Sequence, residues 1–516
     1  MSDFSYTGEL PPARFNLAKY CLHRSATKTP DKAGLIVCPS ADAADAEIWT
    51  YGALEDAVLR IATGMRKYGF APGSRIFLRM KNSVDYALMY LGVNAAGLVP
   101  IPASSQLTAE EVGFMVADSE AAAIAFTPGL AMPDLPKTVV QISADDMATI
   151  KASEKSDYAD TAADDPGFLI YTSGTSGKPK GVLHAQRAVW GRRPMYQGWY
   201  GLNRDDVMLH TGHFNWTYTL GTGLMDPWAN GATAIVYTGP ADPTIWPTLA
   251  QAHKATIISS VPTLYRQILK YNDITNDSFP NLRHGLTAGE PMPADVATDW
   301  QGKTATKLYE ALGMSEISTY ISSSPSIPAR PGSPGKPQAG RSVAILPTDG
   351  STSPLDAGET GLLAIHRSDP GLMLGYWNRP DEEAEVMLGE WFAGGDLARL
   401  DEDGYLWFEG RNDDLMNAMG FRVSPMEVEK ALIDHETVGE VAVAERQVRE
   451  NVSVIAAYVV PAEGHTVDKD TLISHACTHL AAYKAPREII IVDQLPRTGN
   501  GKLMRKALQS ISPSGF

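Results

Sequence analysis

The chain has 516 residues, 44% of them apolar, a length that suits two or three domains better than one continuous core. Its formal charge of -16 excludes a general nucleic-acid surface or an anionic membrane surface, because both would repel an acidic protein. Any phosphate site must therefore be made by a few local residues. The three cysteines, Cys21, Cys38 and Cys477, form no CxxC pair, which argues against a disulfide framework or a zinc site and favours a reducing compartment.

The two ends and the longest apolar run carry no sign of targeting or of a membrane span. The amino terminus is acidic and polar, without the basic region and apolar stretch of a signal peptide. Residues 87–104 are apolar but include Asn94, Pro100 and Pro102, so we expect a buried helix that leads into a strand. The last residues, SPSGF, match no lipidation or peroxisomal signal. We therefore expect a cytoplasmic protein.

Short apolar strands alternate with segments of helical periodicity in the first half of the chain. Strands are expected at residues 33–37, 74–80, 233–237 and 255–261, and helices at residues 53–68 and 84–96. This alternation is typical of α/β layers with partly parallel sheets.

Irregular segments divide the rest of the chain. Residues 145–167 are expected to form an acidic, solvated connection, and residues 322–340 are too rich in Pro, Gly and Ser for a helix or an inner strand. A domain boundary is expected within 410–423, where a strand ends in a polar turn and a new helix begins. We therefore predict an α/β fold with a large N-terminal domain of mixed sheets, residues 1–410, and a small, mobile α+β C-terminal domain, residues 411–516.

The segment YTSGTSGKPKG, residues 171–181, is the strongest candidate for a phosphate site. Its glycines let backbone N–H groups approach phosphate oxygens, while its serine and threonine hydroxyls and its two lysines add donors and charge. A Walker A loop is the main alternative, but that pattern requires glycine where Thr172 stands and Ser or Thr where Pro179 stands. Pro179 also biases Lys178 away from the α region, so the loop is not expected to lead directly into a helix.

This segment resembles the signature loop of the adenylate-forming superfamily, which includes acyl-CoA and aryl-CoA synthetases, nonribosomal adenylation domains and luciferases. A flexible Gly/Ser linker is the alternative, but a linker would not keep an apolar strand before it and the run GVLHAQRAVW after it. Later segments resemble further motifs of the same family, in the same order, over nearly the whole chain. The resemblance implies that ATP is bound by the residues of the loop, which are Thr172, Ser173, Gly174, Thr175, Ser176, Gly177 and Lys178.

The segment TAGEP resembles the turn that frames adenine in this family. The resemblance assigns this contact to the backbone of Gly289, Glu290 and Pro291. Alone, the segment would be interpreted as an ordinary Gly-Pro turn.

The segment EALGMSE resembles the motif that holds the metal ion. The resemblance implies that Glu316 binds Mg²⁺ and that Ser315 reaches a phosphate oxygen, and a hard cation does require oxygen ligands. Without the flanking match, Glu316 would be interpreted as a solvated acid. Relatives often carry an aromatic residue at the Leu312 position, so an aliphatic contact must replace stacking on adenine here.

The segment WFAGGD resembles the motif whose aspartate binds both ribose hydroxyls. Asp396 would take that role, which suits a carboxylate with two acceptor oxygens. Arg411 is implied as a second contact to the ribose or a phosphate. A surface ion pair is the alternative for Arg411.

The segment TGNGK near the carboxyl terminus resembles the turn that carries the adenylation lysine. Lys502 would bridge the substrate carboxylate and the α-phosphate, and so stabilise the negative charge of the transition state. In this family the small domain rotates between the two half-reactions, and Asp413 matches the hinge position, although a simple turn cap is the alternative. After rotation, Gly420, Phe421 and Arg422 would line the tunnel for coenzyme A.

The acid pocket is implied by the segment HTGHFNWTYTLG. Trp216 and Tyr218 are the expected contacts of the acyl group, and ordinary core aromatics are the alternative for both. The opposite wall is expected to come from Gly313, Ser318, Thr319 and Tyr320. This second wall is polar, which favours a small aromatic, polar-substituted, short-chain or medium-chain acid over a long fatty acid.

The sequence therefore predicts an AMP-forming carboxylic acid–CoA ligase, which makes an acyl adenylate from an acid and MgATP and then transfers the acyl group to CoA. A stand-alone adenylation enzyme that loads a carrier protein and a non-enzymatic adenylate-binding relative stay open as alternatives. ATP, Mg²⁺ and coenzyme A are the expected cofactors and co-substrates. We expect no nucleic-acid or membrane partner, and the sequence leaves a monomer and a homodimer open.

Overall fold

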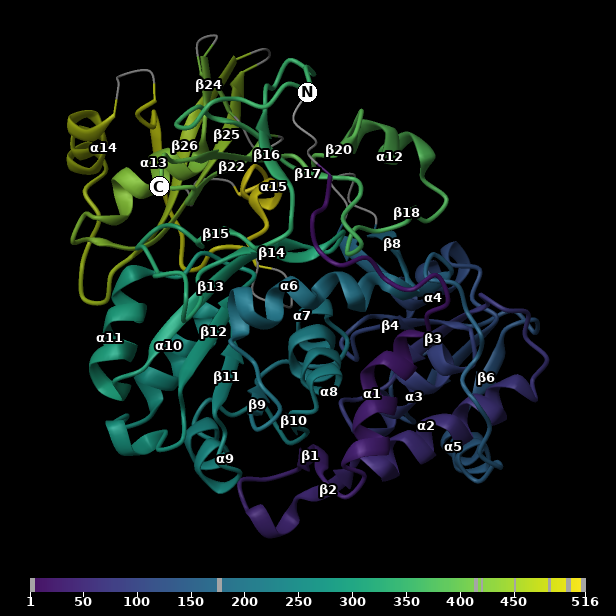
Figure 1. The fold of residues 1–516 in the computed structure, drawn as a ribbon. Helices are drawn as coiled ribbons and strands as arrows, with labels where there is room; N and C mark the ends of the chain where they lie inside the picture. The colour runs from purple at the N-terminus through teal and green to yellow at the C-terminus, as the bar shows by residue number, and fades with distance from the viewer. Residues whose placement is uncertain are drawn as a thin grey trace. The chain divides into compact units, whose positions relative to one another are not determined.

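A computed structural model describes residues 5–173, 179–412, 416–418, 421–449, 452–480, 484–497 and 503–511 (Figure 1). The chain divides into two compact units, Met1–Ser342 with Ile365–Glu390, and Val343–Ala364 with Trp391–Phe516. Each unit combines helices with strands, which confirms the predicted α/β class. The predicted domain boundary after residue 410 marks off the domain that is expected to move during catalysis. This boundary stays a prediction.

The described part of the first unit contains a large sheet with the strand order β15-β14-β13-β12-β11-β9-β10-β1-β2. Its inner strands, from β13 to β1, are parallel, and antiparallel strands lie at both edges. The strands are β1 (Ala33–Cys38), β2 (Glu47–Thr50), β9 (Val207–His210), β10 (Thr233–Tyr237), β11 (Ile257–Ser260), β12 (His284–Ala288), β13 (Lys307–Met314), β14 (Ser318–Ser322) and β15 (Lys336–Pro337). The Pro-rich segment 322–340 thus supplies only an edge strand, as its composition predicts.

The parallel strands of this sheet end at one edge. His210, Ser260, Ala288 and Met314 are the last residues of β9, β11, β12 and β13. In open α/β sheets, ligands bind outside the carboxyl ends of the strands. The motifs 287–291 and 310–316 run into this edge, so the sheet brings them together although they are separated in the sequence.

Both faces of the large sheet are covered. Adjacent strand residues point to opposite faces: Leu209 and Ile258 belong to one apolar cluster, and Met208 and Ile257 belong to another. The first cluster includes residues of α9 (Trp246–Ala252), α10 (Pro262–Tyr271) and α11 (Ala294–Thr304), which Figure 1 shows on one side of these strands. Burial on both faces explains why the inner strands are apolar runs and not alternating patterns.

A second sheet in this unit is parallel, with the order β4-β3-β5-β6. Its strands are β3 (Arg75–Arg79), β4 (Val99–Pro102), β5 (Ala123–Phe126) and β6 (Val140–Ile142), and the helices before and between them are α1 (Leu17–Lys28), α2 (Tyr51–Arg66), α3 (Val84–Ala95) and α4 (Ala109–Asp118). The predicted helix and strand within residues 87–104 are confirmed as α3 and β4. Among the described residues, no helix is both long and apolar enough to cross a bilayer.

The prediction of a solvated connection over residues 145–167 is wrong at its start. Helix α5 (Ala144–Lys151) occupies this part, and Ser143 and Asp146 form a capping box at its N-terminus. Met147 and Ile150 are buried in the main apolar cluster. The acidic residues of the first turn are favourable at a helix N-terminus, so the negative charge marks a helix start here and not a linker.

The second unit contains two β regions. Strands β16 (Val343–Leu346), β17 (Gly361–His366), β21 (Asp396–Leu400) and β22 (Leu406–Arg411) are neighbours in one sheet. Farther along the chain, β25 (Val438–Arg449), β26 (Val452–Pro461) and β27 (Glu488–Ile491) form another sheet, whose apolar cluster includes residues of α13 (Pro425–Ile433) and α14 (Lys469–His479). The short elements are β23 (Met416–Ala418), β24 (Phe421–Val423) and α15 (Arg505–Leu508). This α+β arrangement has its own core.

Candidate active site

The predicted phosphate loop lies at the tip of a hairpin. Strands β7 (Pro166–Ser173) and β8 (Pro179–Ala185) are antiparallel, and Thr172 is paired with Lys180. The prediction that the loop does not lead into a helix is confirmed, because β8 begins at Pro179. Residues Gly174 to Lys178 lie outside the described residues, and of Ser173 only the backbone is described.

The base of this phosphate hairpin is fixed by polar contacts with two other segments. The Tyr171 hydroxyl donates to Asp118 (2.7 Å), and Arg379 forms an ion pair with the same carboxylate (2.5 Å). Burial raises the pKa of Tyr171 above its usual value, so the phenol stays protonated and can donate. Lys180 lies over the ring of Tyr376, with 3.7 Å between Nζ and the ring centre. The lysine is thereby held at the start of β8.

The predicted metal ligand Glu316 lies in the tight turn that joins β13 to β14. Met314 is paired with Ser318, and the Glu316 carboxylate accepts a hydrogen bond from the Tyr376 hydroxyl (2.7 Å). The backbone carbonyl of Glu316 accepts from the Met373 N–H group (2.8 Å). Tyr376 therefore touches both Lys180 and Glu316, and it connects the phosphate hairpin with the Glu316 turn. Tyr376 was not predicted from the sequence, because a lone tyrosine after a glycine carries no local signal.

The residues of the Glu316 turn fit Mg²⁺. Among the described residues, no group of three or more His, Cys, Asp or Glu side chains could hold a metal ion alone. Mg²⁺ does not need such a cage, because it is usually held by one or two carboxylates together with substrate phosphates and water. The Glu316 carboxylate and the Ser315 hydroxyl are hard oxygen donors of this kind.

The predicted adenine-side turn follows β12, and it lies next to a predicted acid-pocket residue. Gly289 has a φ of 95°, a conformation that favours glycine, and a Cβ there would lie 3.3 Å from Cη2 of Trp216. Glu290 accepts a hydrogen bond from the Thr263 hydroxyl (3.2 Å). The indole of Trp216 therefore lies against this turn, so the structure brings a predicted adenine contact and a predicted acid contact together.

A carboxyl group that was not predicted from the sequence lies beside the same turn. Glu310 in β13 accepts a hydrogen bond from the Met292 N–H group (3.2 Å). Desolvation raises the pKa of Glu310 from 4.5 to about 7. The motif contains this residue, but only the tertiary structure shows that Glu310 is partly buried and its carboxyl group partly desolvated.

We expect Glu310→Gln to stabilise the protein at pH 8 and to leave its stability nearly unchanged at pH 4.5. The folded-state pKa lies above the unfolded one, so ionisation of Glu310 costs stability as the pH rises from 4.5 to 7. The amide cannot ionise, which removes a cost of about 2 to 3 kcal/mol above pH 7. Thermal unfolding of both proteins at the two pH values measures the effect. Glu290→Gln is the control, and an equal shift of Tm at both pH values would contradict the assignment.

The aromatic residues of the predicted acid pocket contact each other. The Tyr218 ring lies 5.3 Å from Trp216 and 4.7 Å from His210, both edge to face, and 5.9 Å from Trp199 in a stacked arrangement. The Tyr218 hydroxyl is within hydrogen-bonding distance of the Ser259 hydroxyl (2.8 Å). Tyr218 is buried, whereas Trp216 is only partly buried, so Trp216 is the more accessible of the two predicted contacts.

The second predicted wall of the pocket lies on the hairpin of β13 and β14. A Cβ at Gly313 would lie 2.3 Å from the Ser318 carbonyl oxygen, so only glycine allows this close approach of the strands. Thr319 and Tyr320 are buried, and the hydroxyl of Ser318 accepts a hydrogen bond from Arg192. The structure thus brings these four residues together, while their contact with an acid stays a prediction.

The predicted ribose contacts lie in the second unit. Asp396 is buried and begins β21, and it is paired in register with Arg411 at the end of β22. Nη1 of Arg411 lies 3.1 Å from the Asp396 carboxylate. Gly395 has a φ of 90°, and a Cβ there would lie 3.1 Å from Nη2 of Arg411. The predicted pair is therefore assembled on neighbouring strands.

The remaining predicted roles fall on residues whose side chains are not described. Asp413, Gly420 and Lys502 lie outside the described residues. Phe421 and Arg422 lie in β24, of which only the backbone is described at these positions. Their roles stay predictions.

Comparison with known proteins identifies the family. The model of the AMP-binding enzyme family matches residues 22–377, and the model of the AMP-binding enzyme C-terminal domain matches residues 427–502. The chain is 32% identical to benzoate–CoA ligase of Thauera aromatica over 484 residues, 90% of this chain and 91% of that protein. It is 31% identical to acetyl-coenzyme A synthetase of Bacillus subtilis over 494 residues, 91% of this chain and 86% of that protein.

A solved structure supports the same conclusion. The benzoate CoA ligase of Burkholderia xenovorans LB400 is 26% identical, has a TM-score of 0.83, and is matched over 96% of this chain and 100% of its own length. The phosphate hairpin and the Glu316 turn therefore occur in a fold that this known ligase shares. The chain belongs to the family of AMP-binding enzymes, which confirms the resemblance of its motifs to the adenylate-forming superfamily.

Proposed function

We propose that this protein is an AMP-forming carboxylic acid–CoA ligase that uses MgATP and coenzyme A. The observation that carries the proposal is the convergence of the phosphate hairpin and the Glu316 turn on Tyr376, which contacts Lys180 on one side and Glu316 on the other. Relatives named as benzoate–CoA ligase and acetyl-coenzyme A synthetase share this chain over nine-tenths of its length, and they support the reaction class.

The first half-reaction would join the acid to AMP. An oxygen of the substrate carboxylate attacks the α-phosphorus of ATP, the bond to the bridging oxygen breaks, and pyrophosphate leaves. Glu316 and Ser315 would hold Mg²⁺, which when bound neutralises charge on the phosphates. The hairpin of β7 and β8 would orient the phosphates, and Asp396 would bind the ribose hydroxyls. Lys502 would place its ammonium group between the two anions that must meet.

The second half-reaction would move the acyl group to sulfur. The CoA thiol sulfur attacks the acyl carbonyl carbon, the thiol proton is lost, and AMP leaves with the bonding electron pair. We propose that Lys502 serves only the first half-reaction and that the small domain turns about Asp413 between the two. Gly420, Phe421 and Arg422 would then contact the pantetheine arm of CoA.

The substrate is proposed to be a small aromatic acid or a short- or medium-chain acid. The aromatic cluster of Trp216, Tyr218 and Trp199 favours a flat or compact acyl group. The names of the two relatives contain benzoate and acetyl-coenzyme A, and both acyl groups lie within this range. We also propose that the enzyme acts in the cytoplasm, without a nucleic-acid or membrane partner. Light scattering distinguishes a monomer from a homodimer.

Acid-dependent exchange between ATP and pyrophosphate tests the proposed reaction. The panel should contain benzoate, its hydroxy and amino derivatives, acetate, butyrate, octanoate and palmitate. We expect exchange with a small acid, and release of AMP that requires CoA. Exchange without turnover on CoA would favour a carrier-loading enzyme, and no exchange with any acid would favour an adenylate-binding relative. Best turnover with palmitate would contradict the proposed pocket.

A further inference from the structure

The Glu316 turn ends in a residue with an unusual backbone conformation. Ser318 has a φ of 77°, in the left-handed region that side chains other than glycine rarely adopt. The turn has three residues between the paired positions Met314 and Ser318. Short hairpin turns of this kind place glycine at the left-handed position. A serine there needs other contacts that hold it, and strain of this type is common at functional sites.

The contact that holds Ser318 comes from a buried arginine. Nη1 of Arg192 donates to the Ser318 hydroxyl. The guanidinium is itself fixed by Asp226, which accepts from Nε (2.9 Å) and from Nη2 (2.6 Å). The side chain of Asp226 is 0% exposed and that of Arg192 is 7% exposed, so neither can turn towards water. Tyr200 also donates to Asp226 (2.8 Å). Arg192 is thus a rigid donor, aimed at one end of the turn.

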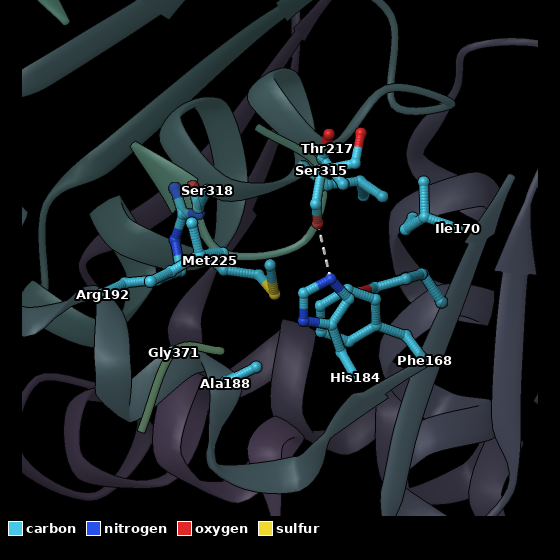
Figure 2. Close-up of a pocket in the computed structure, with 13 residues that line it drawn as sticks. Phe168, Ile170, His184, Ala188, Arg192, Thr217, Met225, Ser315, Ser318 and Gly371 are labelled. Carbon is cyan, nitrogen blue, oxygen red and sulfur yellow. Dashed lines mark hydrogen bonds between the residues drawn. The ribbon is translucent and has the colours of Figure 1, made fainter. Parts of the chain in front are cut away.

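The other end of the turn is held by a histidine. Nε2 of His184 donates to the backbone carbonyl of Ser315 (2.7 Å), as Figure 2 shows. The carbonyl oxygen can only accept a hydrogen bond, so this contact places a proton on Nε2 of His184. The ring stacks on Phe168, with 4.6 Å between the ring centres. His184 therefore keeps a single orientation beneath the turn.

Both holding residues come from the chain that follows the phosphate loop. His184 lies in β8, and Arg192 ends the helical segment Gln186–Arg192 directly after it. Between them is a cavity of about 20 Å³, lined also by Ser315, Ser318 and Met225 (Figure 2). This volume has room for one water molecule and not for a substrate.

We propose that His184 and Arg192 are positioning residues for the proposed metal ligand Glu316. They hold Ser315, the first residue of the turn, and Ser318, the residue that closes it, so that the Glu316 carboxylate faces MgATP in one orientation. Strand β8 of the phosphate hairpin and the helical segment directly after it would thereby set the geometry of the metal site. This inference rests on the proposed role of Glu316.

Two substitutions of Ser318 distinguish the proposed positioning of Glu316 from a direct contact between the Ser318 hydroxyl and a ligand. Ser318→Ala removes the hydroxyl but keeps the Cβ, so the strained conformation loses its support. Ser318→Gly removes the hydroxyl too, but glycine adopts a φ of 77° without strain. We expect the alanine variant to weaken binding of Mn²⁺ in the presence of a non-hydrolysable ATP analogue by about tenfold, the effect of one charge-assisted hydrogen bond. The affinity of the glycine variant for Mn²⁺ should stay within about twofold of that of the natural protein.

Electron paramagnetic resonance of bound Mn²⁺ gives a readout that does not depend on turnover. In Ser318→Ala, the Mg²⁺ concentration needed for half-maximal pyrophosphate exchange should rise together with the loss of Mn²⁺ affinity. The change of kcat at saturating Mg²⁺ should be smaller. Arg192→Lys keeps the charge opposite Asp226 but loses the fork that reaches Ser318, so it should resemble Ser318→Ala. His184→Phe keeps the stacking on Phe168 but loses the donor, and we expect a shift of the same direction.

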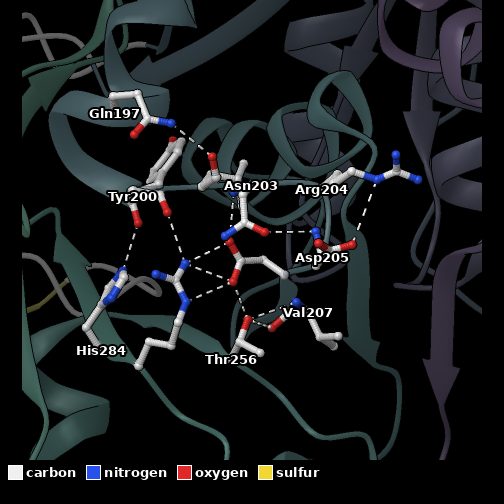
Figure 3. Close-up of polar contacts among 12 residues, drawn as sticks. Gln197, Tyr200, Asn203, Arg204, Asp205, Val207, Thr256 and His284 are labelled. Carbon is white, nitrogen blue, oxygen red and sulfur yellow. Dashed lines mark hydrogen bonds and ion pairs between the residues drawn. The ribbon is translucent and has the colours of Figure 1, made fainter.

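A second arginine–aspartate pair, in which the aspartate is buried and the arginine is 40% exposed, supplies a control. Arg283 contacts Asp206 (2.7 Å) in a polar cluster that also includes Asn203 and Thr256 (Figure 3). This cluster lies at the amino ends of β9, β11 and β12, the opposite edge of the sheet from the Glu316 turn. Arg283→Lys should lower Tm without changing the affinity for Mn²⁺.

The possible outcomes are distinct. Equal losses in Ser318→Ala and Ser318→Gly would overturn the inference, because the hydroxyl itself would then contact a ligand. Unchanged Mn²⁺ affinity in Ser318→Ala, Arg192→Lys and His184→Phe would also overturn it, since His184 and Arg192 would then serve only stability. If the natural protein binds no Mn²⁺ with the ATP analogue, the proposed function fails first.

Discussion

Replacement of Lys502 by alanine is expected to lower the rate of acyl adenylate formation by about 10³-fold, the size of effect seen when one preorganised electrostatic contact to the transition state is lost. The same variant should form the thioester from supplied acyl adenylate at a rate within about threefold of the natural protein, because Lys502 is proposed to leave the site before that step. Single-turnover assays of each half-reaction measure the two rates separately.

A nearby lysine controls for the general loss of charge. Lys506 lies in α15, four residues after Lys502, and Lys506→Ala should leave both half-reactions within about twofold. An equal loss of both half-reactions in Lys502→Ala would contradict the two-step role, because the lysine would then act throughout the cycle. A loss confined to thioester formation would reverse the assignment.

Local sequence patterns predicted those parts of the site whose chemistry is contained in one segment. The apolar run before residue 171 and Pro179 within the loop were enough to predict a strand entering the loop and no helix leaving it, and β7 and β8 confirm this. The predicted strand at 233–237 matches β10. Apolar runs and proline restrict the backbone within a few residues, so their effect can be read from the sequence alone.

Contacts between distant segments could not be predicted in this way. Tyr376 is separated by 60 residues from Glu316, and Asp226 by 34 residues from Arg192. Neither pair has a spacing that marks it in the sequence, because the sheet topology decides which segments meet at its edge. The same limit explains Glu310: its motif was visible, but the desolvation that raises its pKa arises only when β13 is packed among its neighbours.

The roles of the aromatic residues in the acid pocket can be distinguished only when sequence patterns are combined with contacts in the structure. Sequence patterns do not separate a core aromatic from a substrate contact, and the prediction for Trp216 and Tyr218 kept both options open. In the structure, Tyr218 is buried between Trp199 and His210, whereas Trp216 lies against the turn at Gly289. Trp216 is therefore the better position at which to alter the choice of acid, and Tyr218 the better position at which to expect a loss of stability.

Asp396→Asn is expected to raise the KM for ATP by roughly 10- to 100-fold, with a much smaller change of kcat. A carboxylate accepts from both ribose hydroxyls, whereas the amide offers one acceptor oxygen, so at least one charged hydrogen bond worth about 1.5 to 3 kcal/mol is lost. The ribose does not react, so this contact stabilises the ground state and the transition state equally, and its loss appears mainly in KM. Pyrophosphate exchange at varied ATP, together with calorimetric titration of AMP, measures the change.

An ion pair on the same two strands tests whether any carboxylate there would have this effect. Glu409 in β22 pairs with Arg399 in β21 (3.1 Å), and both side chains are about one-third exposed. An exposed pair contributes little, so Glu409→Gln should leave the KM for ATP unchanged and alter Tm only slightly. Asp396 is buried, but its partner Arg411 is partly exposed, so water can solvate the guanidinium in Asp396→Asn and the fold should survive. A rise of KM in both variants would mean that the sheet and not the ribose contact was disturbed, and an unchanged KM in Asp396→Asn would place the ribose elsewhere.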